Sequence, residues 1–137
     1  MGFLKRLALA VSGAVLLAIG LGASPASALP ASVCMTVRSG TGSDLGEGCF
    51  FHYGDIFTVE DHASDGARVV AEWHTDYDRS GECHNAYGAN DRTVTCNYDM
   101  KETGVVSFSV CTQKGATGQP ISCSPHAYVH IGSGARL

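Results

Sequence analysis

Six cysteines carry the clearest chemistry in this chain, because a pair of thiols can form a disulfide or bind a metal ion. Successive cysteines are separated by 11 to 33 residues, so the chain has no C-x-x-C pair of the kind that brings two thiolates to one zinc ion. If the chain is exported, six cysteines predict three disulfides, for which 15 connectivities are possible. Turn-forming residues between the cysteines predict hairpins with sequential pairing. The expected bridges are Cys34–Cys49, Cys83–Cys96 and Cys111–Cys123.

The six histidines are a second set of possible metal ligands. Strand residues at i and i+2 share a face and lie about 7 Å apart, so His74 and Asp76 could contribute to one site. His126 and His130 are four residues apart, or about 13 Å along a strand, which is too far for both to bind one ion. The spacing therefore predicts surface histidines rather than a transition-metal site.

An acidic run offers a candidate calcium site. Asp76, Asp78 and Ser80 stand at alternate positions before Gly81, as in the first half of a calcium-binding loop, and carboxylate oxygens suit this hard cation. The twelfth position of such a loop is Tyr87, where an EF-hand has a bidentate glutamate, and no flanking helix is expected. The alternative is an aspartate-rich turn at the end of a strand.

The remaining polar residues form no recognisable catalytic motif. The chain lacks the G-x-S-x-G, H-E-x-x-H and G-x-x-x-x-G-K-[ST] patterns, and bridged cysteines leave no thiol nucleophile. The sequence therefore predicts a protein that is not an enzyme and binds no cofactor. A pair of carboxylates for glycoside hydrolysis stays open, because only their spacing in the fold decides it. Its candidates are Asp61, Asp65, Glu72, Asp76 and Asp78.

The first residues predict export. A basic start over residues 1–6 precedes the uncharged, apolar residues 7–23, which is a signal-peptide profile. Small side chains at Ala26 and Ala28 predict cleavage before Leu29. The alternative, an uncleaved membrane anchor, would be short, because a membrane-spanning helix needs about 20 apolar residues.

Residues 1–28 are thus expected to be a signal peptide, and residues 29–137 a single secreted, extracellular domain. Cleavage removes two of the nine Lys and Arg residues and none of the 13 Asp and Glu residues, which leaves a formal charge of −6. An acidic domain without a basic patch is poorly suited to phosphate groups, so neither a nucleic-acid nor a membrane partner is expected. The expected partner is an extracellular protein.

The elements that must position these residues are strands. Residues 67–77 alternate Val69, Ala71 and Trp73 with polar side chains, which predicts a half-buried strand with Trp73 facing the core. No helical stripe follows the signal peptide. The expected fold is all-β, either a small antiparallel sandwich of immunoglobulin-like type or a barrel, stapled by three disulfides. Further strands are expected at residues 33–38, 49–53, 56–61, 93–98, 105–112 and 121–131.

The last two of these strands have conflicting faces. If the two cysteines of the last bridge lie opposite each other, Phe108 faces His126, whereas the apolar alternation of the second strand begins one position later, at Ala127. A shift of one residue exchanges the faces of a strand, and a bulge is the usual remedy. We expect a bulge or break at Ser124 and Pro125, because Pro125 lacks an amide proton for the ladder.

Residues 105–124, VVSFSVCTQKGATGQPISCS, carry a resemblance to a known group. A valine-rich strand ending in Val-Cys leads through a glycine-containing turn to Cys-Ser. With the signal peptide and an upstream cysteine pair, this pattern resembles small exported proteins of actinobacteria. The resemblance covers mainly residues 67–124 and implies a disulfide-bonded β domain with no established activity. A looser likeness is to secreted β-sandwich inhibitors of α-amylase, whose Trp-Arg-Tyr turn is absent here, since Trp73 stands in Glu-Trp-His.

Together these observations predict a non-catalytic secreted β domain that binds another protein or a surface outside the cell. The first alternative is a protein inhibitor of an extracellular hydrolase, which would present a rigid exposed loop near a disulfide. The turns at residues 115–120 and 87–91 are the available loops. The second alternative is a calcium-binding domain that uses the acidic run.

Overall fold

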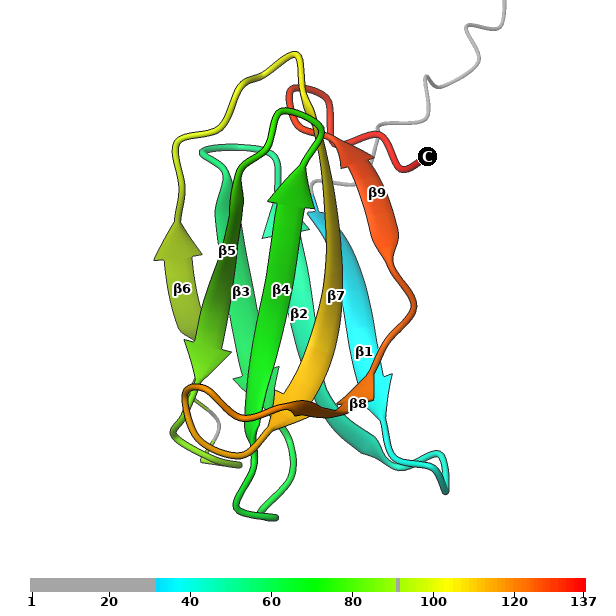
Figure 1. Cartoon of the computed structure of the whole chain (residues 1–137), viewed down its shortest axis with the longest axis vertical. Coiled ribbons are helices and arrows are strands. Elements are labelled where there is room, and N and C mark those ends of the chain that lie inside the picture. Colours follow the sequence, from blue (N-terminus) through cyan, green and yellow to red (C-terminus); the bar gives the residue numbers. More distant parts are fainter. Residues whose placement is uncertain (1–31, 91) are drawn as a thin grey trace, which may run out of the picture.

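The computed structural model describes residues 32–90 and 92–137, and within them the chain forms nine strands in two antiparallel sheets (Figure 1). The expected all-β fold with three disulfides is confirmed, and it is a sandwich of two sheets. The expected signal peptide lies outside the described residues. The strands are β1 (Ser32–Arg38), β2 (Asp44–Phe51), β3 (Ile56–Asp61), β4 (Arg68–Thr75), β5 (Ser80–Asn85), β6 (Val94–Asn97), β7 (Val105–Gln113), β8 (Pro120–Cys123) and β9 (Ala127–His130).

The described residues include no helix long and apolar enough to cross a membrane.

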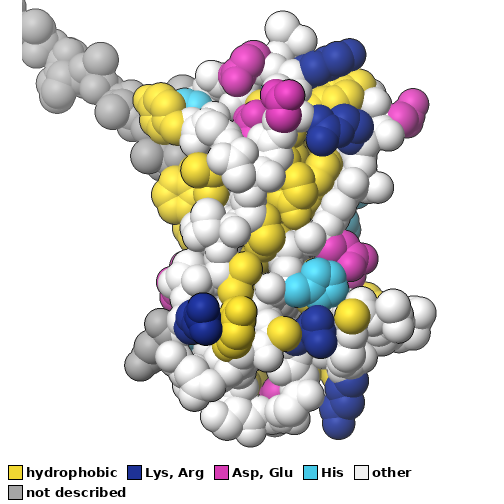
Figure 2. Space-filling view, turned by 90° about the vertical axis from the view of Figure 1, so that its left-hand side faces the viewer, with side chains coloured by type: hydrophobic (Ala, Val, Ile, Leu, Met, Phe, Trp, Pro, Cys, Tyr) yellow, Lys and Arg dark blue, Asp and Glu magenta, His cyan; other side chains and the backbone are white. Residues whose placement is uncertain are grey.

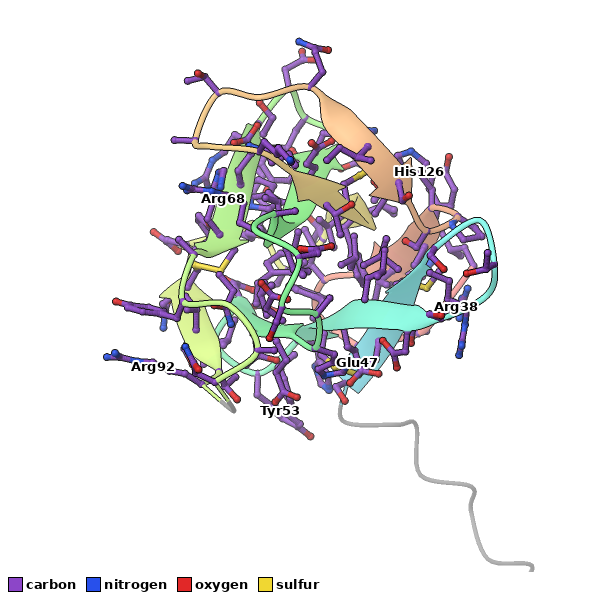
Figure 3. All side chains as sticks on the ribbon, turned by 90° about the horizontal axis from the view of Figure 1, so that it is seen from below. Arg38, Glu47, Tyr53, Arg68, Arg92 and His126 are labelled. Atoms are coloured by element: carbon purple, nitrogen blue, oxygen red, sulfur yellow. A yellow bond between two sulfur atoms is a disulfide. The ribbon has the colours of Figure 1, made fainter. Side chains whose placement is uncertain are left out.

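Sheet A has the strand order β1-β2-β3-β6, and sheet B has the order β5-β4-β7-β8, with β9 also paired to β7. Because β4 pairs with β7 along its whole length, β8 and β9 follow one another on the opposite side of β7. The chain passes from one sheet to the other after β3, β5 and β6. Seen from below, His126 lies in the layer of sheet B and Glu47 in the layer of sheet A (Figure 3).

Aromatic side chains from both sheets fill the centre of the core. The ring centroid of Phe57 on β3 lies 5.0 Å from that of Phe50, 5.3 Å from that of Phe108 and 6.3 Å from that of Trp73. Trp73 is only 3% exposed, which confirms that the alternating residues of β4 face the core. Burial of this apolar surface is the main force that holds the two sheets together.

Three disulfides brace the sandwich in two ways. Cys34–Cys49 joins β1 to β2 and Cys111–Cys123 joins β7 to β8, with Cα atoms 4.0 and 4.1 Å apart, so each lies within a hairpin. Cys83–Cys96 instead joins β5 of sheet B to β6 of sheet A, with Cα atoms 5.9 Å apart. Figure 2 faces the edge of the molecule that β5 and β6 form, and it shows hydrophobic side chains along that edge. The pairing is the one that the turn-forming segments predict.

The expected break in the last hairpin is present. Cys111 lies opposite Cys123, but four residues later along the second strand Ala127 lies opposite Phe108, so the register shifts by one residue between β8 and β9. Ser124 fills the break: its amide donates to the carbonyl oxygen of Val110 at 2.8 Å, and its Oγ accepts from the Val110 amide at 2.9 Å. The shift places the buried Ala127 toward the core and its neighbours toward solvent.

Strand β2 begins at Asp44, whereas the sequence predicted a strand only from Cys49. The reason is the close approach of the two sheets. A Cβ atom at Gly46 would lie 2.5 Å from a methyl group of Val69, and one at Gly48 would lie 2.7 Å from a methyl group of Val110. These glycines are therefore strand residues that admit side chains of the facing sheet.

Strand β5 was not expected from the sequence, and it contains part of the acidic run. Gly81 lies opposite Trp73 in the ladder, where a Cβ atom would be 2.6 Å from the indole ring. A glycine in a strand marks such close approaches, but the sequence does not tell which large side chain it faces.

Candidate functional site

The outer face of sheet B contains a hollow of about 570 Å³. Its side chains come from β4, β5, β7 and the break before β9, so segments distant in sequence meet there. Two of the lining residues are histidines, two are glutamates and two are serines; the other two are Gly81 and Trp73, whose ring packs in the core beneath Gly81. The lining residues are Glu72, Trp73, His74, Ser80, Gly81, Glu82, Ser109 and His126.

Two histidine rings meet in this hollow. The ring centroids of His74 and His126 are 6.0 Å apart, with 64° between the ring planes. His126 reaches this face because the register shift turns Ala127 inward and therefore turns its neighbours outward. Tyr128, which is 49% exposed, lies beyond His126 at 6.4 Å between ring centroids.

Ser107 positions the His74 ring. Its hydroxyl is hydrogen-bonded to Nε2 of His74 at 2.7 Å, across the β4–β7 ladder. A serine–histidine pair can perform acyl transfer when the hydroxyl reaches a substrate and a third group orients the imidazole. Ser107 is only 4% exposed, and no hydrogen bond within the described residues reaches Nδ1 of His74. The pair is therefore suited to orienting the imidazole within the hollow.

Two glutamates face each other in the same hollow. Glu72 on β4 lies directly opposite Glu82 on β5, and like charges at such positions repel. Glu82 has a hydrogen-bond partner, because Nε2 of His84 lies 2.7 Å from one of its carboxylate oxygens. Among the described residues, no side-chain hydrogen bond or ion pair holds the Glu72 carboxylate. A cation or a hydrogen-bond donor bound in the hollow would therefore reduce the repulsion between the two carboxylates.

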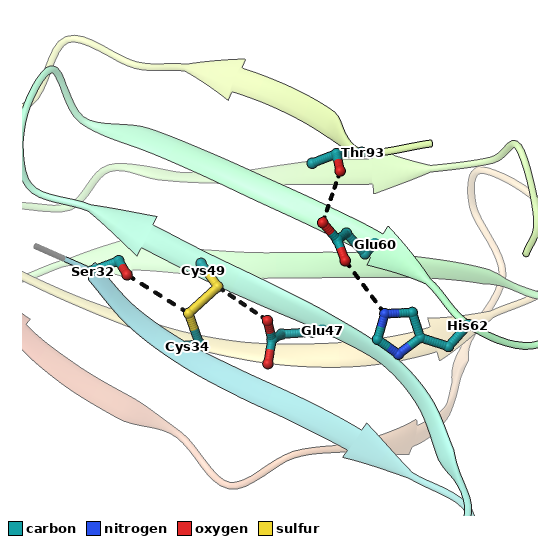
Figure 4. The surroundings of a disulfide bond; sticks show 7 residues. All are labelled: Ser32, Cys34, Glu47, Cys49, Glu60, His62 and Thr93. Atoms are coloured by element: carbon teal, nitrogen blue, oxygen red, sulfur yellow. Dashed lines mark hydrogen bonds and ion pairs between the residues drawn. A yellow bond between two sulfur atoms is a disulfide. The ribbon is translucent and has the colours of Figure 1, made fainter. Parts of the chain in front are cut away.

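The outer face of sheet A holds a different histidine arrangement (Figure 4). His62 follows β3, and its Nδ1 and Nε2 lie 3.0 Å from an oxygen of Asp44 and 3.5 Å from an oxygen of Glu60. The hydrogen bond to Asp44 raises the pKa of His62 above its ordinary value, and Glu60 adds to this effect. The Glu60 carboxylate also accepts a hydrogen bond from Thr93 at 2.8 Å. Both ring nitrogens of His62 therefore have a carboxylate partner.

A second hollow of about 390 Å³ adjoins this group, lined by Glu60, Asp61, His62, Ala89 and Arg92. Asp61 is only 6% exposed; one carboxylate oxygen accepts from the Ala63 amide at 3.0 Å and the other has no partner among the described residues. Burial raises the pKa of Asp61 above its ordinary value. The unpartnered oxygen is buried, and the other oxygen accepts a hydrogen bond from the backbone just after β3. This carboxyl group therefore stabilises the end of that strand.

The residues of the acidic run take separate positions. The Asp76 carboxylate accepts a hydrogen bond from the Val105 amide at 3.0 Å, and Asp78 has a positive φ of 62° in the β4–β5 turn. Ser80 is the first residue of β5 and lies opposite His74. The run thus forms an aspartate-rich turn followed by a strand. Calcium binding by Asp76, Asp78 and Ser80 stays a prediction, which a melting curve with millimolar calcium tests.

The structure also locates the other candidate ligands. Within the described residues, one group of three His, Cys, Asp or Glu side chains has its ligand atoms close together, and it consists of Cys34, Glu47 and Cys49. The two sulfurs of that group are bonded to each other, so they are not free thiolates (Figure 4). Of the carboxylates considered for glycoside hydrolysis, Asp61 and Glu72 line different hollows.

The turn at residues 115–120 is exposed and braced. The buried amide of Gln113 donates to the carbonyl oxygens of Gly115 and Ala116 at 3.0 and 3.2 Å, and the Cys111–Cys123 bridge closes its base. Residue 91 of the second candidate loop lies outside the described residues; at the start of that loop, the centroid of the Tyr87 ring lies 4.0 Å from the guanidinium of Arg92.

No known protein family, curated protein or solved structure matches the chain.

The sequence did not predict that His74 and His126 meet. The i and i+2 rule compares residues on one strand, whereas these two histidines come from β4 and from the break between β8 and β9. The conflict of faces at Ser124 was the available signal, because it implied that His126 must leave the inward face.

Proposed function

We propose that the protein is an exported, non-catalytic binding domain whose contact surface is the outer face of sheet B. The observation that carries this proposal is the hollow of about 570 Å³, in which charged, aromatic and hydroxyl side chains converge. The three disulfides are typical of extracellular proteins; two of them brace hairpins and Cys83–Cys96 joins the two sheets. A rigid surface binds more tightly than a flexible one, because less conformational entropy is lost on association.

The chemistry of the hollow defines the partner that it fits. Glu72 and Glu82 favour a basic or hydrogen-bond-donating group, and the exposed ring of Tyr128 supplies the aromatic contact that is common at the centre of interfaces. We therefore expect an extracellular protein that inserts an arginine or lysine side chain between these residues.

The test is co-precipitation from the culture supernatant of the producing organism. Glu72→Lys reverses the charge of the hollow and is expected to abolish capture of the partner that the unmodified protein retains. Thr95→Lys is the matched control, because Thr95 is an exposed residue of β6 in sheet A. Retention by Glu72→Lys together with loss in Thr95→Lys, or no specific capture by the unmodified protein, would refute the proposal.

Inhibition of an extracellular hydrolase is the second candidate, favoured by the braced turn at residues 115–120. Inhibitors of hydrolases need a loop that is held before binding, and Gln113 and the adjacent disulfide hold this one. Purified α-amylases and proteases should lose activity when the protein is added, and Lys114→Ala, at the exposed start of the loop, should weaken that effect. Full activity of all these enzymes in the presence of the protein would exclude this candidate.

A further inference from the structure

Two imidazoles and a free carboxylate share the hollow of sheet B, and this set has a chemistry of its own. His74 and His126 approach to 6.0 Å between ring centroids. Glu72 lies two residues before His74 on the same face of β4 and is half-buried, with no side-chain partner among the described residues. The ligand atoms of these three residues are not all close together in the structure, so metal binding requires the Glu72 side chain to rotate toward the rings.

We propose that His74, His126 and Glu72 bind a divalent transition-metal ion. Imidazole nitrogen suits copper(II), zinc(II) and nickel(II), and a carboxylate oxygen completes a set of three protein ligands with an open position for water. A bound cation would also remove the repulsion between Glu72 and Glu82. Hard cations such as calcium prefer oxygen ligands only, so they are not expected to compete at this site.

Ser107 prepares His74 for this role. An imidazole that binds a metal through one nitrogen usually donates the other N–H to a neighbouring acceptor, which fixes the ring and its tautomer. The Ser107 hydroxyl lies 2.7 Å from Nε2 of His74 and can accept that hydrogen bond, which leaves the lone pair of Nδ1 for the metal. Ser107 is therefore a positioning residue of the proposed site.

The metal proposal concerns the isolated protein and does not depend on the partner of the proposed function. Capture of the partner in the presence of a chelator tests the proposed function alone, whereas a titration of the purified protein with metal tests this inference alone. Either proposal can therefore fail without the other.

The single tryptophan of the chain makes the experiment specific. Trp73 is adjacent to His74, lines the hollow and is 3% exposed, so copper(II) in bulk solvent has little contact with the indole ring. We expect copper(II) to quench the tryptophan fluorescence in a saturable way with one equivalent per chain. Zinc(II), which does not quench, should reverse the effect by competing for the same ligands, and a large excess is needed because zinc(II) binds them more weakly than copper(II).

The variants assign the effect to the site. His74→Ala and His126→Ala should each weaken copper(II) quenching by at least about tenfold in apparent affinity, since loss of one imidazole removes a principal ligand. His130→Ala is the matched control, because this exposed histidine of β9 is not in the hollow, and its titration should follow that of the unmodified protein. Ser107→Ala should give an intermediate loss.

Three results would overturn the proposal: no saturable quenching in the unmodified protein, equal quenching in all the histidine variants, or loss of quenching in His130→Ala alone. Thermal melting of each variant without metal guards against misfolding, and His126→Asn provides a second substitution at the surface. Millimolar calcium should leave the copper(II) titration unchanged. Competition by calcium would also count against the assignment.

Discussion

The outer faces of the two sheets contain similar residues in different arrangements. Each face carries one hairpin disulfide, and each carries histidine beside glutamate. On sheet A, His62 is held by two carboxylates. On sheet B, His74 faces His126, and the carboxylate of Glu72 on the same face has no partner among the described residues.

The difference follows from the continuity of the two ladders. Sheet A is regular apart from one shift between Val37 and Arg38 near the end of β1. Sheet B loses one register position between β8 and β9, and Ser124 takes over the backbone hydrogen bonds of Val110. The interruption places the side chain of His126, which lies outside the regular strand pairing, on the outer face of sheet B. A polar hollow arises where strand pairing stops, without any change in the buried core.

Removal of each hairpin disulfide compares the two faces directly. The variants Cys34→Ala/Cys49→Ala and Cys111→Ala/Cys123→Ala should each lose about 3 kcal/mol of unfolding free energy, because the closed loops are of similar length. Only the second pair should also weaken copper(II) quenching of Trp73, since Cys123 immediately precedes the break that positions His126. Urea unfolding and the fluorescence titration measure the two effects, and an equal loss of quenching in both variants would contradict the distinction.

The break itself should be sensitive to a single atom. Ser124→Ala removes the Oγ that accepts from the buried Val110 amide, and an unsatisfied buried donor costs about 1–3 kcal/mol. Ser122→Ala, two residues before Ser124 in β8, is the control and should change the stability by less than about 0.5 kcal/mol. Equal destabilisation by the two substitutions in urea unfolding would mean that Ser124 does not hold the shifted register.

Most of the fold could be predicted from local chemistry. The alternation around Trp73, the turn-forming segments between cysteines and the conflict of faces at Ser124 are all properties of neighbouring residues. The assignment of strands to two sheets could not be predicted, because it depends on contacts between distant segments. The meeting of His74 with His126 and the close approach of Gly81 to Trp73 belong to this second class.

A substitution at Gly81 tests how closely the Trp73 ring packs against β5 beneath the sheet B hollow. In Gly81→Ala the new Cβ would lie 2.6 Å from the Trp73 ring, and such overpacking costs about 1–3 kcal/mol. Gly40→Ala, in the β1–β2 turn at the end of sheet A, is the matched control, because nothing lies within 4 Å of its Cβ position. The fluorescence maximum of Trp73 should shift in the first variant only. Unchanged stability of Gly81→Ala would show that the indole ring can move aside.

The histidine that is paired with two carboxylates on sheet A should make the stability of the protein depend on pH. Because the hydrogen bond to Asp44 raises the pKa of His62 in the folded state, its stabilising contribution is present below pH 6.5 and is lost as the pH rises through the folded pKa. His62→Gln should therefore reduce the fall in unfolding free energy between roughly pH 6 and pH 8, by less than about 0.5 kcal/mol since the group is exposed. Urea unfolding at several pH values measures the slope in the two proteins, and an unchanged slope in His62→Gln would contradict the stabilising role of the contact with Asp44.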